Sequence, residues 1–378
     1  MAATPEEIVV PDSLKPADGR FGSGPSKVRP EAVQALADLA GSWMGTSHRQ
    51  DPVKRVVGSV RAGLTELFGL PDGWEIVLGN GGTTAFWDAA TFHLVEEHSQ
   101  HLVFGEFSSK FADCVAAAPH LKDPTIVESA TGTHPVATPA ADVDLYAFTH
   151  NETSTGVMMS LERPAGAGAN GLVAVDATSG AGGLRWSPAE VDVYYFAPQK
   201  SFASDGGLWL AACSPAAVER IARLASSGRW CPAFLDLGIA LDNSRKDQTY
   251  NTPALATLFL LDQQVQWFNS QGGLSWSAGR CDASADALYG WADASPYATP
   301  FVADPAQRSR VVGTIDLADG IDATLVSKVL RRNGIVDTDS YRKLGRNQLR
   351  IAMFPAIDPA DVQALTACID HVVEQLAS

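Results

Sequence analysis

The sequence predicts an α/β fold with a mixed, mostly parallel sheet, and three features carry that prediction. The first is a series of short apolar runs rich in β-branched residues, clearest at 172–175 and 191–196. Runs of this length that alternate with amphipathic segments are typical of strands buried on both faces. The second is that polar residues follow these two runs, Asp176 after one and Lys200 after the other. The third is a glycine-rich turn at 79–84 between a predicted strand and a predicted helix.

Strands and helices are expected to alternate along the first 270 residues. Strands are expected at 74–78, 101–104, 125–128, 144–149, 172–175, 191–196 and 207–213. Helices are expected at 30–39, 52–68, 85–95, 108–118, 215–225 and about 253–268. Thr252 is the expected cap of the last helix. The segments 164–171 and 230–247 are predicted to be loops.

A break in the helical pattern at 271–273, Gln-Gly-Gly, predicts a domain boundary. Residues 1–20 are polar, contain prolines and lack periodicity, so we expect them to form an N-terminal arm. Residues 21–270 would then form a large domain, and residues 271–378 a smaller α/β domain. Within the smaller domain, 348–352 is predicted as a strand.

Composition and charge narrow the class of protein. Hydrophobic residues at 46% and charged residues at 19% are ordinary for a globular enzyme. The net charge of −15 argues against general binding to nucleic acid or to an anionic membrane. The five cysteines lack metal-ligand spacing, so neither a disulfide framework nor a metal site is indicated. The N-terminus does not resemble a signal peptide and no apolar run has the length of a membrane span, so we expect a cytoplasmic protein.

Asp176 and Lys200 suit one particular chemistry. Ligand sites in open α/β sheets lie beyond the carboxyl ends of the strands, which is where both residues are expected. A lysine there can form a Schiff base with pyridoxal phosphate, while an aspartate keeps the pyridine nitrogen protonated. The ordinary alternative is an exposed loop lysine beside a turn-capping aspartate. Further candidate residues along the chain, described next, make that alternative less favoured.

A phosphate cup for such a cofactor is expected at the glycine-rich turn. Gly82, Thr83 and Thr84 lie between a strand and a helix, so backbone N–H groups and the helix dipole would face an anion. The turn matches neither a Walker A loop nor a dinucleotide-binding fingerprint. Phe107 lies just past the next strand and either stacks on a planar ring or packs in the core.

Other polar residues are candidates that also have ordinary explanations. His48 and Arg49 lie in a polar loop, and Ser23 lies in a Ser-Gly-Pro turn. The polar cluster at 150–156 follows a strand and would either contact a cofactor or close a turn. Arg350 is the one arginine in an apolar strand, so it should point either to solvent or to an anion.

Together these residues resemble the phosphoserine aminotransferase family, which belongs to the class V, fold type I pyridoxal-phosphate enzymes. The resemblance runs in family order from about residue 21 to residue 350 and is strongest to the actinobacterial type. The matching pieces are Ser23-Gly24-Pro25, Ser47-His48-Arg49, Asn80-Gly-Gly-Thr-Thr, Asn151-Glu-Thr153, Val175-Asp176, Gln199-Lys200, Asn251-Thr252-Pro253 and Leu349-Arg350. Single pieces are weak signals, but their combination in this order is specific.

The resemblance implies roles for the matching residues. Lys200 would form the Schiff base, and Asp176 would hold the pyridinium nitrogen. The implied cofactor contacts are Gly82, Thr83, Thr84, Phe107, Thr153, Asp176, Gln199 and Lys200. Asn251 and Thr252 would reach the cofactor phosphate of the neighbouring subunit, which implies a homodimer with a shared active site. The implied substrate contacts are Ser23, His48, Arg49, Arg346 and Arg350, with Arg350 as the carboxylate clamp.

The chain departs from the family pattern in two places. Members commonly carry arginine where Thr83 stands, so phosphate binding would depend more on N–H and hydroxyl groups. Members also carry a His-Arg pair upstream of the last arginine, where this chain has Arg342-Lys343-Leu-Gly-Arg346. Which of Arg342, Lys343 and Arg346 meets the substrate phosphate stays open in the sequence.

The implied reaction transfers the amino group of L-glutamate to 3-phosphohydroxypyruvate, giving O-phospho-L-serine and 2-oxoglutarate in serine biosynthesis. The sequence leaves open whether 4-phosphohydroxythreonine, of pyridoxine biosynthesis, is also a substrate. The alternatives are another class V enzyme, such as alanine–glyoxylate aminotransferase or a cysteine desulfurase, and a non-enzymatic regulator that binds pyridoxal phosphate. A desulfurase needs a reactive loop cysteine, and the loop-like candidate in the small domain, Cys281, lacks a supporting motif.

Overall fold

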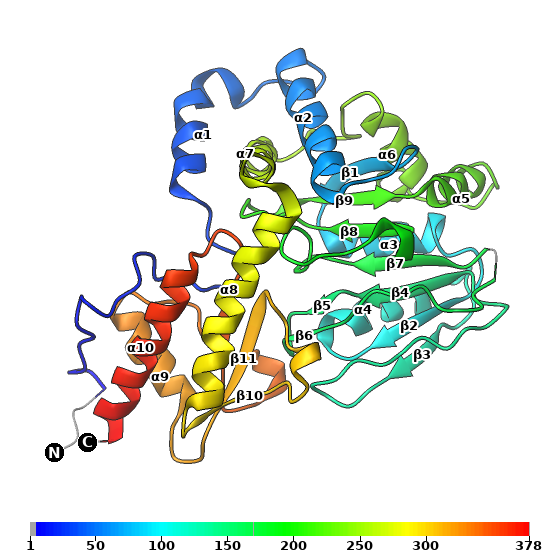
Figure 1. Cartoon of the computed structure of the whole chain (residues 1–378). Coiled ribbons are helices and arrows are strands. Elements are labelled where there is room, and N and C mark those ends of the chain that lie inside the picture. The colour runs from blue at the N-terminus through cyan, green and yellow to red at the C-terminus, as the bar shows by residue number, and fades with distance from the viewer. Residues whose placement is uncertain (1–4, 169, 378) are drawn as a thin grey trace.

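A seven-stranded sheet forms the centre of the molecule in the computed structural model, which describes residues 5–168 and 170–377 (Figure 1). The strand order is β1-β9-β8-β7-β4-β2-β3. The strands are β1 (Glu75–Gly81), β2 (Ser99–Val103), β3 (Thr125–Glu128), β4 (Leu145–Thr149), β7 (Leu172–Asp176), β8 (Val193–Phe196) and β9 (Gly207–Cys213). Strand β9 is antiparallel to β1 and β8, and the other neighbouring pairs are parallel. The predicted mixed, mostly parallel sheet is therefore confirmed.

Helices cover both faces of this sheet (Figure 1). One face packs on α2 (Asp51–Phe68) and α7 (Leu255–Gln271), with α1 (Pro30–Trp43) beside α7. The other face packs on α3 (Thr83–His93), α4 (Glu106–Ala116), α5 (Pro215–Ala225) and α6 (Leu237–Ser244). Successive side chains of β7 alternate between the two cores, Val173 and Val175 in one and Leu172 and Ala174 in the other. Burial on both faces explains why this strand is a continuous apolar run in the sequence.

A third core lies in the C-terminal part of the chain. It contains an antiparallel sheet of β10 (Ala298–Pro300), β11 (Val312–Leu317) and β12 (Gln348–Ala352), and the helices α8 (Gly273–Ala294), α9 (Ala323–Arg332) and α10 (Pro359–Ala377). Ile8 and Val10 of the predicted arm are buried in this core. Helix α7 ends where a break is predicted, because Gly272 adopts a φ of 122° that favours glycine. The division into domains at residues 20/21 and 270/271 stays a prediction.

Two predictions about local structure are wrong. The predicted loop at 230–247 contains α6, whose first turn is capped by Asp236 through a hydrogen bond from the Ile239 N–H at 3.0 Å. Thr252 does not cap the next helix, because α7 begins at Leu255 after Ala254 and the Thr252 hydroxyl instead contacts His48. The predicted strand at 191–196 is confirmed from residue 193 onward.

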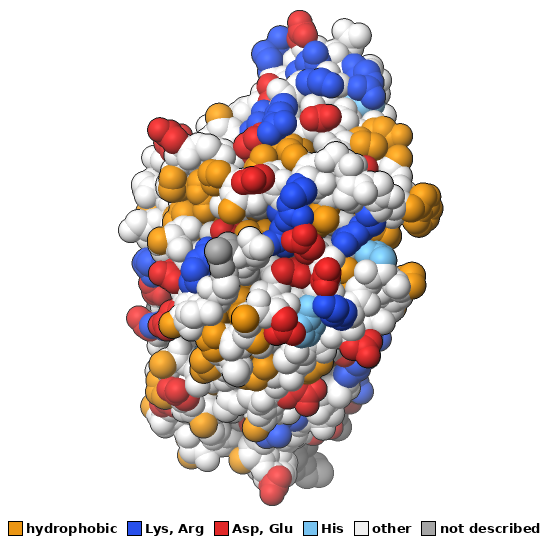
Figure 2. Space-filling model, turned by 90° about the vertical axis from the view of Figure 1, so that its right-hand side faces the viewer, with side chains coloured by type: hydrophobic (Ala, Val, Ile, Leu, Met, Phe, Trp, Pro, Cys, Tyr) orange, Lys and Arg blue, Asp and Glu red, His pale blue; other side chains and the backbone are white. Residues whose placement is uncertain are grey.

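The face of the molecule drawn in Figure 2 carries both acidic and basic side chains. Figure 2 shows acidic and basic side chains interspersed over the middle of the face that forms the right-hand edge of Figure 1, while several Lys and Arg side chains gather at its upper end. Across residues 5–168 and 170–377, the helices are all too short or too polar to cross a membrane. A small hairpin of β5 (Asn151–Glu152) and β6 (Val157–Met158) follows β4 and leads toward the site described next.

Candidate active site

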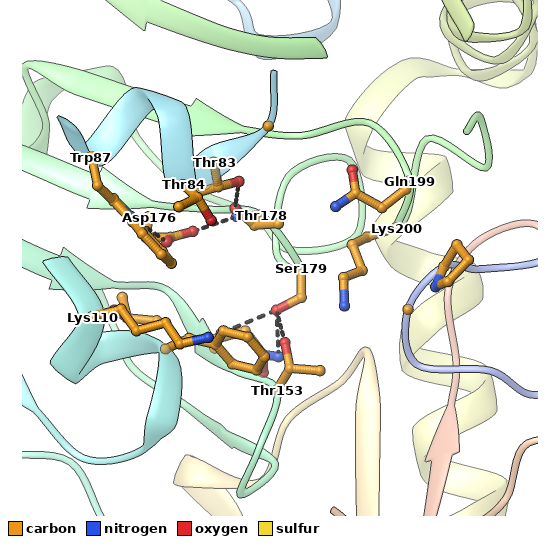
Figure 3. Close-up of a pocket in the computed structure, with 16 residues that line it drawn as sticks. Thr83, Thr84, Trp87, Lys110, Thr153, Asp176, Thr178, Ser179, Gln199 and Lys200 are labelled. Atoms are coloured by element: carbon orange, nitrogen blue, oxygen red, sulfur yellow. Dashed lines mark hydrogen bonds between the residues drawn. The ribbon is translucent and has the colours of Figure 1, made fainter. Parts of the chain in front are cut away.

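A cavity of about 370 Å³ lies at the carboxyl ends of the central strands (Figure 3). Asp176 ends β7 and is in register with Thr149 at the end of β4, while Lys200 lies in the turn after β8. The cavity is lined by Gly24, Pro25, Gly82, Thr83, Thr84, Trp87, Phe107, Lys110, Thr149, Asn151, Thr153, Asp176, Thr178, Ser179, Gln199 and Lys200. The expectation that Asp176 and Lys200 share one strand-end site is met by this geometry.

The Lys200 amine is buried and is held by the Ser-Gly-Pro turn that begins at Ser23. Its Nζ donates a hydrogen bond of 2.6 Å to the carbonyl oxygen of Ser23. A Cβ at Gly24, whose φ is 155°, would lie 2.0 Å from Nζ, so a side chain there would displace the amine. Burial lowers the pKa of Lys200 to about 8, the Arg350 charge adds to this, and Asp176 and Glu152 oppose it. A large fraction of the amine is therefore neutral near pH 8.

The Asp176 carboxylate is fixed by two donors. The indole Nε1 of Trp87 donates to Oδ2 at 3.1 Å, and the Thr178 N–H donates to Oδ1 at 2.9 Å. Burial raises the pKa of Asp176 to about 6, although both hydrogen bonds favour the charged form. A cationic partner in the cavity would favour the ionised carboxylate further. Figure 3 shows Asp176 and Lys200 on opposite sides of the open space.

The glycine-rich turn, which is predicted to bind an anion, lies at the cavity. Gly82 precedes α3, and the first turn of that helix has no side-chain cap among the described residues. Gly82, Thr83 and Thr84 line the cavity, and the first N–H groups of a helix have no partner within the helix. The Thr83 hydroxyl is 2.6 Å from the Thr178 hydroxyl, so Thr83 occupies the wall next to the Asp176 loop.

The remaining wall contains polar atoms that lack protein partners. Ser179 Oγ accepts from Asn151 Nδ2 and Thr153 Oγ1, each at 2.9 Å. Asn151 Oδ1 and Gln199 Oε1 are buried and have no hydrogen-bond partner within the described part of the chain. Buried polar groups are nearly always paired, so these orphaned oxygens indicate a bound polar molecule. With a lysine, a fixed carboxylate and a helix N-terminus around one cavity, the residues fit pyridoxal phosphate.

Glu152 fixes the segment that carries Phe107. Its carboxylate is fully buried and accepts from the N–H groups of Phe107 and Ser108 and from the N–H and hydroxyl of Ser154. The distances are 3.1, 2.8, 3.1 and 2.6 Å, respectively. Glu152 thereby caps the first turn of α4 and holds Phe107 at the cavity wall.

Arg350 lies at the border between the two parts of the molecule. Its Nη1 donates a long bond of 3.4 Å to the Thr153 carbonyl, and its guanidinium lies 5.2 Å from the centre of the Tyr341 ring. Its Nε is buried without a partner among the described residues, and burial lowers its pKa. A buried guanidinium with a free donor edge suits an incoming carboxylate.

Other predicted site residues lie apart from the cavity lining. His48 Nδ1 is 3.2 Å from the Thr252 hydroxyl, and Arg49 donates to Gln248 at 2.6 Å. Asn251 and Thr252 are exposed in the single chain. Arg346 donates to both oxygens of Asp316, with Nε at 3.1 Å from each. The roles assigned to these residues stay predictions.

Sequence reasoning missed several residues of the cavity. Trp87 lies one helical turn beyond Thr83, and Lys110 lies one turn beyond Phe107. Helical spacing from the predicted phosphate and stacking residues would have identified both. Thr178 and Ser179 follow Asp176 within three residues, as a strand-end loop does.

The lowered pKa of Lys200 predicts how the ligand-free protein would take up pyridoxal phosphate. Only the neutral amine attacks a carbonyl, and a pKa of about 8 makes that form dominant above pH 8. We expect the rate of covalent attachment of pyridoxal phosphate, followed by absorbance, to rise with pH and level off above about 8. Because the Arg350 charge contributes to the shift, Arg350→Ala should move the midpoint upward. A rate that keeps rising beyond pH 10 would contradict the burial effect.

Comparisons with known proteins agree with this geometry. The family model described as aminotransferase class-V matches residues 21–339. A phosphoserine aminotransferase of Rhodococcus jostii is 61% identical over 376 residues, with 100% of each chain covered. A solved phosphoserine aminotransferase from Cytophaga hutchinsonii has a TM-score of 0.86 at 23% identity, covering 93% of this chain and 99% of its own. A PLP-bound phosphoserine aminotransferase from Trichomonas vaginalis has a TM-score of 0.79 at 20% identity, with the same coverage. The predicted fold type I architecture is confirmed.

Proposed function

The chain belongs to the class-V aminotransferase family, and we propose that it transfers the amino group of L-glutamate to 3-phosphohydroxypyruvate. The products are O-phospho-L-serine and 2-oxoglutarate, which places the reaction in serine biosynthesis. The observation that carries the proposal is that Lys200 and Asp176 line one cavity, where the Arg350 charge acts on Lys200. Identity of 61% over the whole chain to a phosphoserine aminotransferase supports the choice of substrates.

The protein is a pyridoxal-phosphate-dependent enzyme, and its residues define how the cofactor would be held. Lys200 would bind it covalently, Asp176 would pair with the ring nitrogen, and the N–H groups at Gly82, Thr83 and Thr84 would meet the phosphate. The bound cofactor supplies an electron sink for the carbanion that forms at the substrate Cα.

Side chains of the protein would transfer or stabilise the protons of the reaction. Lys200 Nζ, with its pKa lowered to about 8, is suited to accept the Cα proton of glutamate and to return a proton in the second half-reaction. Asp176, which the Trp87 and Thr178 donors hold in place, would stabilise a proton on the ring nitrogen through its negative charge. Phe107, fixed through Glu152, limits water at the wall of the cavity.

The substrates are selected by their negative charges. Arg350 would bind the α-carboxylate, which every substrate carries, with Ser23 nearby at the Lys200 amine. His48 and Arg49 would bind the phosphate. Because these two residues do not line the cavity of their own chain, we propose that they act in a homodimer, each serving the site of the neighbouring subunit. Asn251 and Thr252, which lie beside His48, would reach the neighbour's cofactor phosphate in the same dimer. We place the enzyme in the cytoplasm, where its amino-acid substrates are made.

Cys281 does not support the desulfurase alternative. It lies inside α8 rather than in a loop, it is fully buried, and burial raises the pKa of its thiol. A nucleophilic cysteine must be an accessible thiolate, so this thiol is structural.

Activity with a panel of oxoacids tests the proposal. With glutamate as donor, 3-phosphohydroxypyruvate should give the highest kcat/KM, and glyoxylate, pyruvate and hydroxypyruvate should be poor acceptors. Arg49→Ala should lose roughly 2–5 kcal/mol of transition-state stabilisation with the phosphorylated acceptor only, as when a buried charge pair is truncated. Arg350→Ala should weaken both classes of acceptor.

The control is a comparison of the two arginine variants on hydroxypyruvate. Equal losses for both acceptors in Arg49→Ala would reject the phosphate assignment. A preference of the wild-type enzyme for glyoxylate would instead identify another class-V aminotransferase.

A further inference from the structure

The carboxylate of Glu106, the residue before Phe107 of the cavity wall, is bound by two lysines from separate parts of the chain. Glu106 begins α4, and its Oε1 is 2.5 Å from Lys343 Nζ and 3.7 Å from Lys110 Nζ. Lys110 lies one turn further along α4 and lines the cavity. Lys343 lies in the short helical turn Arg342–Leu344 of the C-terminal part. Figure 3 shows the Lys110 side chain extending from α4 into the pocket.

Lys110 and Lys343 are the two cations that the structure pairs with Glu106. Arg346, three residues beyond Lys343, uses its guanidinium on Asp316 and lies 4.5 Å from the centre of the Phe301 ring. Tyr341 contacts the Phe107 ring at 6.1 Å, so the segment that carries Lys343 lies against the wall of the cavity. Lys343, Tyr341 and Glu106 line a hollow next to the cavity, so Lys343 is connected to the cavity wall through Glu106 and the Tyr341–Phe107 contact.

The ion pairs at Glu106 are of a kind that exchanges easily. The Lys110 and Lys343 side chains are 43% and 70% exposed, and exposed pairs contribute little to stability. An ammonium group is a mobile point charge without the fixed fork of arginine, so it can follow a new anion. Both ammonium groups share one carboxylate oxygen, whereas a phosphate monoester offers three oxygens and nearly two negative charges.

We propose that Lys110 and Lys343 recognise the phosphate of the substrate, and that Glu106 holds both lysines until the phosphate displaces it. This inference rests on the proposed function, because it assigns the residues of one chain that select a phosphorylated oxoacid. The lysines add to His48 and Arg49, which come from the neighbouring subunit. Glu106 thus lowers the affinity of the empty site for free anions and aligns the two lysines in advance.

Kinetics of lysine variants of the holoenzyme test the assignment. Lys110→Met and Lys343→Met should each raise KM for 3-phosphohydroxypyruvate about tenfold, which corresponds to about 1.4 kcal/mol. Turnover of hydroxypyruvate should change by less than about twofold, because that acceptor carries no phosphate. Lys122→Met is the matched control, since Lys122 forms an exposed pair with Glu97 at 2.7 Å and does not line the cavity.

Glu106→Gln separates displacement from a merely structural ion pair. If Glu106 competes with phosphate, its removal should lower KM for the phosphorylated acceptor by about two- to fivefold, the range of an exposed pair. Inorganic phosphate should then also become a stronger competitive inhibitor. A structural ion pair predicts the opposite, that Glu106→Gln raises KM as the lysine variants do.

Three results would overturn the assignment of Lys110 and Lys343 to the substrate phosphate. A fourth result would instead overturn the proposed function. Equal losses with both acceptors in Lys110→Met, no change in the lysine variants, or weaker binding in Glu106→Gln would each reject it. If the wild-type enzyme uses neither acceptor, the proposed function fails. The lysine pair is then tested by titrating the holoenzyme with inorganic phosphate, where Lys110→Met should weaken the spectral response about tenfold.

Discussion

Lys200→Ala should abolish transamination and leave the fold intact. The variant loses both the covalent link to the cofactor and the amine that moves the Cα proton, so we expect turnover to fall by roughly 10⁵-fold or more, the scale of removing a covalent nucleophile. Stability should change little. Burial disfavours the charged form of Lys200, and the variant loses the 2.6 Å hydrogen bond from Nζ to the Ser23 carbonyl.

Two matched variants identify the cause of the loss. Lys200→Arg keeps a positive charge but cannot form the covalent link, and should be as inactive as Lys200→Ala. Lys110→Ala removes the other lysine of the cavity and should keep the visible absorbance of the bound cofactor. Circular dichroism and thermal unfolding of the apoenzymes check the fold. Near wild-type turnover in Lys200→Ala would show that the reaction occurs at a different site.

The central strands could be predicted closely because of how they are buried. Strand β7 was expected at 172–175 and runs from Leu172 to Asp176, since a strand with both faces covered has no polar alternation to interrupt the run. The strand-end rule then placed Asp176 and Lys200 on one side of the sheet. The observed cavity joins the same two residues.

Contacts between distant segments could not be predicted in this way. The Trp87 indole meets Asp176 across 89 residues, and Lys343 meets Glu106 across 237. Neither contact can be recognised from the residues next to it in the sequence, because each depends on how distant segments pack together. Helix α6 was missed for a different reason: its eight residues are too few for a 3.6-residue period to be clear.

His48 and Thr252, which are predicted to serve a site shared between subunits, lie close together in the structure. His48 and Thr252 were singled out separately, and the structure brings them within 3.2 Å of each other. Their position outside the cavity of their own chain agrees with a role at a neighbouring subunit. A single sequence contains no direct signal for that geometry, since both residues lie outside helices and strands.

Asp176→Asn should bind the cofactor and still lose activity by at least about 10²–10³-fold, as when a group that stabilises developing charge is removed. The amide has nearly the same shape as the carboxylate but cannot keep the ring nitrogen protonated. The electron sink is therefore lost while Lys200 remains in place. Single-turnover absorbance changes on adding glutamate measure this step, and undiminished rates would exclude the proposed role of Asp176.

The fold of Asp176→Asn should survive because two effects on stability oppose each other. Asp176 has a folded pKa of about 6, above its ordinary value of 3.8, so the folded apoenzyme disfavours the charged form. This penalty is absent below pH 4, grows between pH 4 and 6 and reaches about 3 kcal/mol above pH 6. The amide removes it but leaves either the Trp87 indole or the Thr178 N–H without an acceptor, at a cost of about 1–3 kcal/mol. At pH 8 we therefore expect an unfolding temperature close to that of the wild-type apoenzyme. At pH 4, where only the cost remains, the variant should be the less stable protein. A variant that is markedly less stable at pH 8 as well would attribute the lost activity to folding rather than to the missing charge.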